Sequence, residues 1–136
     1  MIAIDTNILV YAFDVTDTHK HTISKQIFEN AISGKREIVI TNQVLAEFIN
    51  VSTRKIPVPL TRTEAAIVTS AIIQNRYWIT YNYTSRSVAA AASAKQPFWD
   101  ALLAQTLIEN GVREIYTENV KDFAGSGVKA INPFRK

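Results

Sequence analysis

The chain has 136 residues, of which 47% are hydrophobic and 20% are charged, with four glycines and four prolines. This composition excludes a disordered or fibrous chain, and the length predicts one domain over residues 1–136. There is no cysteine, which excludes disulfides, thiolate metal sites and a cysteine nucleophile and makes a cytoplasmic setting the expected one. No apolar run approaches the ~20 residues of a membrane span.

The first predicted element is a buried strand over residues 1–4, because this apolar run is too short for a helix. Asp5 follows directly, and with the next two residues it supplies capping side chains for a helix through Phe13. Asp5 is therefore expected at the carboxyl end of a strand. After a polar stretch, the pattern predicts a helix around residues 21–33, which Gly34 ends.

The middle of the chain predicts one strand and two helices. Residues 37–40 form the second strand, and a helix with an apolar stripe follows over residues 42–54. The Ile-Pro-Val-Pro segment at residues 56–59 cannot continue that helix. Thr61 and Glu64 then form a capping-box pattern that begins a helix to about residue 75.

The last third of the chain begins with residues 77–83, whose aromatic and β-branched side chains fit either a short strand or an ordered loop. An alanine-rich helix is expected over residues 85–95, and Pro97 suits the first position of a helix to residue 110. Further strands are expected at residues 114–117 and 128–131. Strands that alternate with helices predict an α/β fold, an α/β/α sandwich around a mainly parallel central sheet.

Two acidic residues follow predicted strands. In open parallel sheets, ligands bind at the carboxyl ends of the strands. Asp5 comes directly after the first strand, and Asp122 follows the third after a short turn. Each also has a local explanation, since Asp5 can cap a helix and Asp122 can be a solvated turn residue.

Two further acidic residues lie on predicted helices. Asp100 is in a first helical turn, where the helix dipole favours a carboxylate, but its apolar neighbours, which include Phe98 and Trp99, suggest a buried charge that needs a partner. Glu47 lies on the flank of an apolar stripe, and a salt bridge to Arg54 is the competing explanation for it. Neither residue identifies a site by itself.

Taken together, these four carboxylates predict a metal-dependent site. If they face one crevice, they raise one another's pKa unless a cation lies among them, and Mg²⁺ or Mn²⁺ prefers oxygen ligands. Such a site can hydrolyse a phosphodiester with metal-activated water and needs no nucleophilic side chain. Without these four charges the net charge of +3 becomes +7, which suits a nucleic acid. His19 and His21 are expected at the surface or at a helix start rather than in the site.

Four segments carry a resemblance to a known family: IAIDTNILVYAF, VLAEFINV, PFWDALLAQTLIENG and IYTENVKDF. In these motifs the chain resembles the PIN-domain ribonucleases over essentially its whole length, and its size is similar to that of VapC-type toxins of toxin-antitoxin pairs. The resemblance implies an endoribonuclease dependent on Mg²⁺ or Mn²⁺. It implies that the catalytic and metal-binding carboxylates are those of Asp5, Asp100, Glu47 and Asp122, with Asp5 and Asp100 as the principal ligands.

The same resemblance implies supporting hydrogen bonds from Thr6, Asn7, Thr117 and Asn119. Some relatives have aspartate where this chain has Asn119, so the fourth acidic role is assigned to Asp122 or shared between the two positions. The implied partners are an RNA substrate, a second copy in a homodimer and a small antitoxin.

Basic and aromatic residues could contact RNA. The candidate phosphate contacts are Lys20, Lys25, Arg54, Lys55, Arg86 and Lys121, although such charges are usually only solvated. The aromatic residues of the 77–83 segment could stack bases, with core or dimer packing as the alternative.

Two alternative functions fit the sequence less well. A haloacid-dehalogenase-like phosphatase requires a second aspartate two positions after the first, where this chain has Asn7. The other is a catalytically weak PIN-like module that binds RNA or protein without cutting it, and the complete carboxylate set argues against it.

Overall fold

The computed structural model describes residues 1–135. Its strands are β1 (Ile2–Ile4), β2 (Ile38–Thr41), β3 (Ile79–Tyr81), β4 (Glu114–Tyr116) and β5 (Lys129–Ile131). Its helices are α1 (Thr6–Tyr11), α2 (Thr18–Ile32), α3 (Asn42–Arg54), α4 (Arg62–Gln74), α5 (Ser85–Ala92) and α6 (Phe98–Glu109), with a 3-10 turn η1 (Val120–Phe123) before β5.

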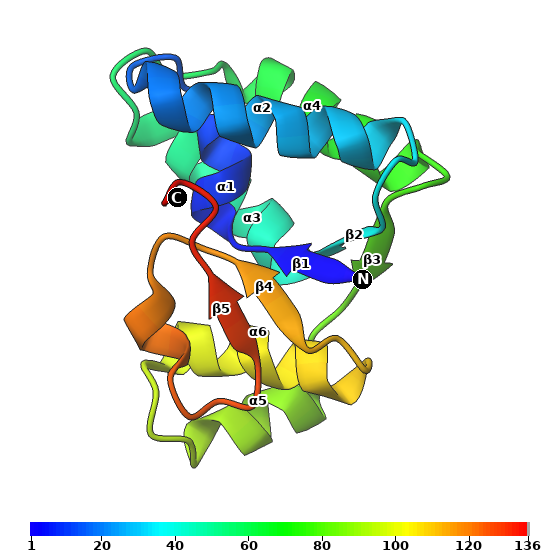
Figure 1. The fold of residues 1–136 in the computed structure, drawn as a ribbon, viewed down its shortest axis with the longest axis vertical. Helices are drawn as coiled ribbons and strands as arrows, with labels where there is room; N and C mark the ends of the chain where they lie inside the picture. Colours follow the sequence, from blue (N-terminus) through cyan, green and yellow to red (C-terminus); the bar gives the residue numbers. More distant parts are fainter. Residues whose placement is uncertain (136) are drawn as a thin grey trace.

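The five strands form one parallel sheet in the order β3-β2-β1-β4-β5. The chain moves outward from β1 to β3 and then crosses back to place β4 on the other side of β1. Because such crossovers are right-handed, this reversal puts α1 to α4 on one face of the sheet and α5 and α6 on the other (Figure 1). The predicted α/β/α sandwich with a parallel sheet is confirmed, and its strand order changes direction between β1 and β4.

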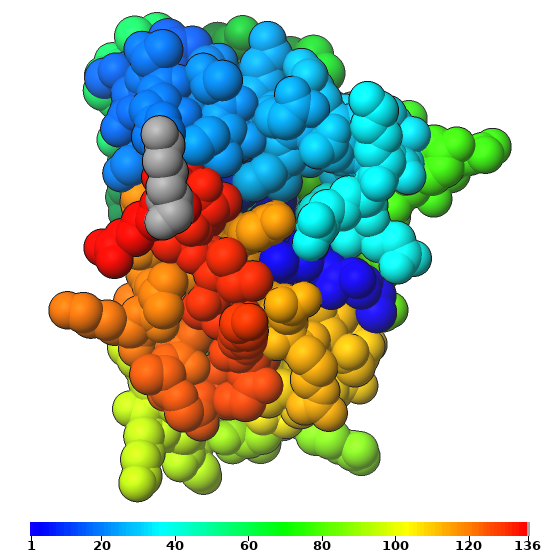
Figure 2. Space-filling view, viewed as in Figure 1, coloured from blue at the N-terminus to red at the C-terminus, as the bar shows by residue number. Residues whose placement is uncertain are grey.

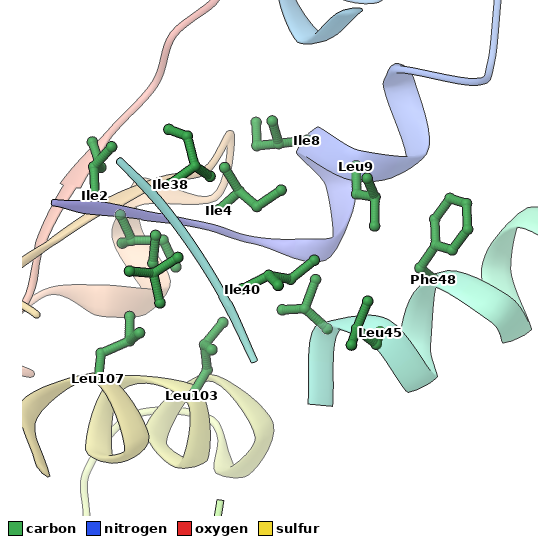
Figure 3. Packing of buried hydrophobic residues seen from close by; sticks show 14 of the residues in the cluster. Ile2, Ile4, Ile8, Leu9, Ile38, Ile40, Leu45, Phe48, Leu103 and Leu107 are labelled. Atoms are coloured by element: carbon green, nitrogen blue, oxygen red, sulfur yellow. The ribbon is translucent and has the colours of Figure 1, made fainter. Parts of the chain in front are cut away.

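The central strands are short apolar runs because helices cover both of their faces. All three residues of β1 and all four of β2 are buried. Figure 3 shows Leu103 and Leu107 of α6 on one side of the strands, while Ile4 of β1 and Ile40 of β2 point to the other side, toward Leu9 of α1 and Leu45 of α3. This packing fixes the helix starts at the carboxyl edge of the sheet, where the candidate site lies.

Several predicted boundaries change in the structure, and one open question is answered. The helix expected from residue 21 begins at Thr18, because the Asp17 side chain accepts a hydrogen bond from the Lys20 amide and caps it there. The open question over residues 77–83 resolves as β3, which pairs with β2. Pro97 takes the cap position of α6 rather than its first helical position.

The C-terminal segment returns to the helices at the start of the chain (Figure 2). The rings of Tyr11 and Phe134 meet edge to face with centroids 5.5 Å apart. His19 contributes to the same junction through its Nε2 atom, which lies 3.1 Å from the carbonyl oxygen of Phe134. Within residues 1–135, no helix is both long enough and apolar enough to cross a membrane.

Gly34 ends α2 with a φ of +76°, and a Cβ there would lie 2.7 Å from the Tyr77 ring. We expect Gly34→Ala to lower the free energy of unfolding by about 2–3 kcal/mol, since it adds a clash to the left-handed backbone. Gly111 is a matched control, with a φ of +74° and open space around a Cβ. Gly111→Ala should cost only about 1 kcal/mol, so equal losses in urea unfolding would contradict the contribution of the Tyr77 contact.

Candidate active site

A pocket of about 360 Å³ brings together three of the four predicted carboxylates, Asp5, Glu47 and Asp100. They come from the end of β1, the second turn of α3 and the first turn of α6. The pocket therefore lies where the strand order of the sheet reverses, which is the usual ligand position in open parallel sheets. The remaining lining residues are Thr6, Asn7, Val10, Tyr11, Asp14, Val51, Ile56 and Asn119.

Asp5 is the most buried of the three acidic residues, with 7% of its surface exposed. It is the N-cap of α1, and its Oδ1 atom accepts a hydrogen bond from the Thr6 amide at 2.8 Å. Its Oδ2 atom accepts a hydrogen bond from the Thr117 hydroxyl at 2.8 Å and a longer one from the Asn7 amide group at 3.5 Å. These bonds fix the carboxylate between β1 and β4, so the capping explanation and a site role are compatible.

Glu47 is held by Gln43, one helical turn earlier on α3. The Gln43 side chain donates from Nε2 to Glu47 Oε1 at 3.1 Å and to the carbonyl oxygen of Trp99 at 2.9 Å. Thr6 adds a weaker bond to Glu47 Oε1 at 3.4 Å. Among residues 1–135, the ion pair expected between Glu47 and Arg54 as the competing explanation does not form.

Asp100 is half-buried at the start of α6. The residues after it, Ala101 and Leu102, are buried as expected, but Phe98 and Trp99 are 39% and 60% exposed. The apolar surroundings predicted for Asp100 are therefore present on one side only, and the prediction is wrong for the side that carries Phe98 and Trp99. The first turn of a helix leaves that side open to solvent, so only the residues that face the sheet are covered.

The three predicted site carboxyl groups that line the pocket, those of Asp5, Glu47 and Asp100, all have raised pKa values. Burial is the largest cause in each case. For Asp100, burial and the charges of Asp5, Asp122 and Glu47 together raise the pKa to about 6. Burial also raises the pKa of Asp5 against the opposing effect of the Thr117 and Thr6 hydrogen bonds. For Glu47, burial raises the pKa and the bond from Gln43 opposes it. The group thus favours a bound proton or a cation.

The fourth predicted carboxylate, Asp122, lies in η1 and lines an adjacent depression with Glu118, Lys121 and Arg135. Its charge still reaches the pocket, since it raises the pKa of both Asp5 and Asp100. Asn119 lines both the pocket and the depression. Of the two candidates for the fourth site position, Asn119 therefore lines the pocket itself. Asp122 lies beside the pocket and affects it through its charge.

Two histidines that the sequence placed outside the site are indeed not among the pocket residues. His19 contacts the C-terminal segment, and His21 Nδ1 donates to the Tyr11 carbonyl oxygen at 2.8 Å. Both belong to the first turn of α2.

Sequence reasoning missed a polar cluster at the rim of the pocket. Tyr11 donates to Glu118 Oε1 at 2.8 Å, and Lys20 forms a salt bridge with Glu118 Oε2 at 2.8 Å. Lys20, a candidate phosphate contact, is therefore engaged by a neighbouring carboxylate. Gln43 was missed as well, although its position four residues before Glu47 places it on the same helix face.

The donor atoms of the pocket are carboxylate, hydroxyl and amide oxygens, which suit Mg²⁺ or Mn²⁺ better than a metal that prefers nitrogen or sulfur. In the described part of the chain, however, no three acidic or histidine side chains converge into a ready-made metal cluster. One buried acceptor, Gln43 Oε1, has no hydrogen-bond partner in residues 1–135. The residues fit an ion held by few protein ligands, as Mg²⁺ usually is.

The family model described as "PIN domain" matches residues 2–124. The chain belongs to the PIN domain family. Ribonuclease VapC24 of Mycobacterium tuberculosis (strain CDC 1551 / Oshkosh) is 30% identical to this PIN domain over 139 residues, which cover 96% of the chain and 94% of that protein.

Two solved structures share the fold of this PIN domain. One is Mycobacterium tuberculosis VapC20, described as a "Sarcin-Ricin loop cleaving toxin", with a TM-score of 0.69, 18% identity and coverage of 94% of this chain and 96% of that one. The other is a toxin-antitoxin complex from Klebsiella pneumoniae, with a TM-score of 0.63, 22% identity and coverage of 98% of both chains. The family resemblance that the sequence motifs indicated is confirmed.

Thr117 is the residue that joins β4 to the acidic pocket of this PIN domain. It is fully buried, donates to Asp5 and accepts a hydrogen bond from the Asn119 amide at 3.0 Å. We expect Thr117→Val to lower the free energy of unfolding by about 1–3 kcal/mol, because both partners lose a buried hydrogen bond. It should also raise the pKa of Asp5 further, since the hydroxyl lowers that pKa.

Urea unfolding and the pH dependence of the protein's activity measure these two effects. Thr117→Ser keeps the hydroxyl and is the control. Because valine retains the γ-methyl group of threonine, a valine variant as stable as the wild type would contradict the contribution of the two hydrogen bonds.

Proposed function

We propose that this PIN domain is a metal-dependent endoribonuclease that hydrolyses RNA phosphodiester bonds, and that it is the toxin of a toxin-antitoxin pair. The observation that carries the proposal is that Asp5, Glu47 and Asp100, which come from three distant segments, line one pocket and each have a raised pKa. The similarity to a protein named as a ribonuclease over almost the whole chain supports it.

The proposed cofactor is Mg²⁺ or Mn²⁺. Asp5 and Asp100 would be its principal ligands, Glu47 a further ligand or a group that positions water, and Asp122 a fourth carboxylate acting from beside the pocket. When bound, the ion would supply Lewis acidity toward the phosphate and lower the pKa of water in the site. Waters and substrate oxygens would complete a ligand set to which the protein contributes only part.

The side chains around the carboxylates orient them. Thr117 and the Thr6 amide hold the two oxygens of Asp5 in different directions. Within residues 1–135, both hydrogen bonds to Glu47 reach its Oε1 atom, which leaves Oε2 available to accept a proton from the attacking water. Glu47 is suited to this role because burial raises its pKa.

The proposed partners are single-stranded or structured RNA, a second copy in a homodimer and a small antitoxin that covers the pocket. The antitoxin is supported by the toxin-antitoxin complex among the similar structures. The remaining cationic candidates for phosphate contacts are Lys25, Arg54, Lys55, Arg86 and Lys121.

Cleavage of end-labelled RNA by the purified protein tests the enzymatic part. We expect cut product with Mg²⁺ or Mn²⁺, none with EDTA, and recovery when Mn²⁺ is added in excess. Cleavage that survives excess EDTA would contradict metal dependence. RNA binding without any cleavage in Mn²⁺ would favour the binding module instead.

Expression in a bacterial host tests the toxin assignment separately. We expect growth arrest that is relieved when the product of a small open reading frame adjoining the gene is co-expressed. Normal growth under expression of a protein that cleaves RNA in the purified assay would contradict the toxin role and leave the ribonuclease role intact.

A further inference from the structure

Two exposed aromatic side chains directly precede Asp100, which lines the pocket. Trp99 is 60% exposed and Phe98 is 39% exposed, and their rings meet edge to face with centroids 5.2 Å apart. By contrast, Trp78 is only 6% exposed. A tryptophan usually buries most of its surface, so an exposed pair next to an acidic pocket requires a partner.

The exposed pair is fixed to the acidic pocket. Gln43, which is 4% exposed, bonds from one nitrogen to both the Trp99 carbonyl oxygen and the Glu47 carboxylate. Pro97 restricts the backbone immediately before the pair. The backbone that carries the rings therefore holds one position relative to Glu47 and Asp100.

We infer that Phe98 and Trp99 form a stacking surface for an unpaired base of the RNA strand whose phosphate enters the pocket. This inference rests on the proposed ribonuclease function and assigns it a substrate contact. A base is joined to the sugar beside the phosphate that is cut, so it must leave the pocket across its rim. Aromatic side chains bind the face of any base, and a tryptophan held in place loses little entropy in doing so.

The surroundings of the pair favour a nucleic-acid strand over a second protein surface. A stable protein interface buries about 1,600 Å² in total, far more than two side chains can supply. The residues that precede the pair, Lys95 and Gln96, are a cation and a polar amide, and Lys95 is exposed. A cation close in sequence to exposed aromatic rings suits the phosphate backbone of a single strand.

Binding of two fluorescein-labelled RNAs of the same length tests the inference, one with normal bases and one with abasic positions. The protein carries Asp5→Asn to prevent cleavage, and Mg²⁺ is present. We expect Trp99→Ala in this background to weaken binding of the normal RNA about 5- to 100-fold, the effect of losing one stacked base. Binding of the abasic RNA should not change.

Ile67→Ala is the matched control, because Ile67 is 64% exposed but lies on α4, on the opposite face of the sheet from α6. It should leave both affinities unchanged. A second readout uses Trp78→Phe, which leaves Trp99 as the single tryptophan, since the chain has two. Normal RNA should quench its fluorescence and abasic RNA should not.

Equal loss of affinity for both RNAs, or no loss for either, would overturn the stacking role while leaving the ribonuclease proposal in place. A change in oligomeric state on Trp99→Ala, with RNA binding unaltered, would assign the pair to a contact between copies and also overturn it. If the parent protein binds neither RNA and its wild-type form cuts none, the proposed function fails and the stacking role fails with it.

Discussion

Asp5→Asn is expected to reduce RNA cleavage by about 10³-fold while leaving the fold intact. The asparagine side chain keeps the shape of Asp5 and can still accept the hydrogen bond from the Thr6 amide that caps α1. It cannot supply the negative charge that holds a divalent cation. Because burial raises the pKa of the Asp5 carboxyl, removal of its charge should not destabilise the protein.

Initial rates on end-labelled RNA, together with urea unfolding, measure both halves of this prediction. Asp17→Asn is the matched control, since Asp17 is likewise the N-cap of a helix, α2, but is not among the residues that line the pocket. It should retain wild-type activity. Near-normal cleavage by the Asp5 variant would remove Asp5 from the proposed metal site.

Asp100→Asn should combine a loss of at least about 100-fold in activity with a gain in stability at neutral pH. The folded-state pKa of Asp100 is about 6, above the ordinary aspartate value of 3.8, so the folded protein binds a proton more tightly than the unfolded chain. Stability from this group is present at low pH, falls as the pH rises between about 4 and 6, and stays reduced above 6.

Replacement by asparagine removes the loss of stability that ionised Asp100 causes. Since Asp100 is half exposed and solvent screens its charge, the gain should be about 1 kcal/mol at pH 7.5 without divalent ions, and it should disappear at pH 4. Mg²⁺ should narrow the difference in free energy of unfolding between the variant and the wild type, because the ion stabilises the wild-type protein, which has the complete set of carboxylates.

Urea unfolding at the two pH values, with and without Mg²⁺, measures the effect. Glu37→Gln, which removes an exposed carboxylate before β2, is the control and should change stability by less than about 0.5 kcal/mol. A stability gain for Asp100→Asn that is the same at both pH values would show that the charge of Asp100 is not the cause.

The sequence was most informative where one physical constraint dominates. Strands buried on both faces must be short apolar runs, so β1 and β2 were readable, and the residue after β1 had to lie at the carboxyl edge of the sheet. Asp5 was therefore predictable, and its bond to Thr117 follows once β4 lies beside β1.

Other features depend on contacts that a linear pattern does not contain. The partner of Gln43 on α6 is 56 residues away, and a glutamine on a helix has many possible uses. Hydrophobicity suggested that Phe98 and Trp99 are buried, but the open first turn of α6 exposes them. Whether Asn119 or Asp122 faces the pocket depended on the 3-10 turn, which no residue pattern specified.

The bond between Asp5 and Thr117 joins residues 112 positions apart. Bringing these two residues together lowers the conformational entropy of the chain, and only the contacts of the completed sheet offset that loss. The acidic pocket should therefore be among the last features to form. During synthesis, Asp5 leaves the ribosome long before β4 and Thr117, which orient its carboxylate. On the proposed ribonuclease function, we therefore expect a nascent chain to be unable to cut RNA near the ribosome until β4 has emerged and docked.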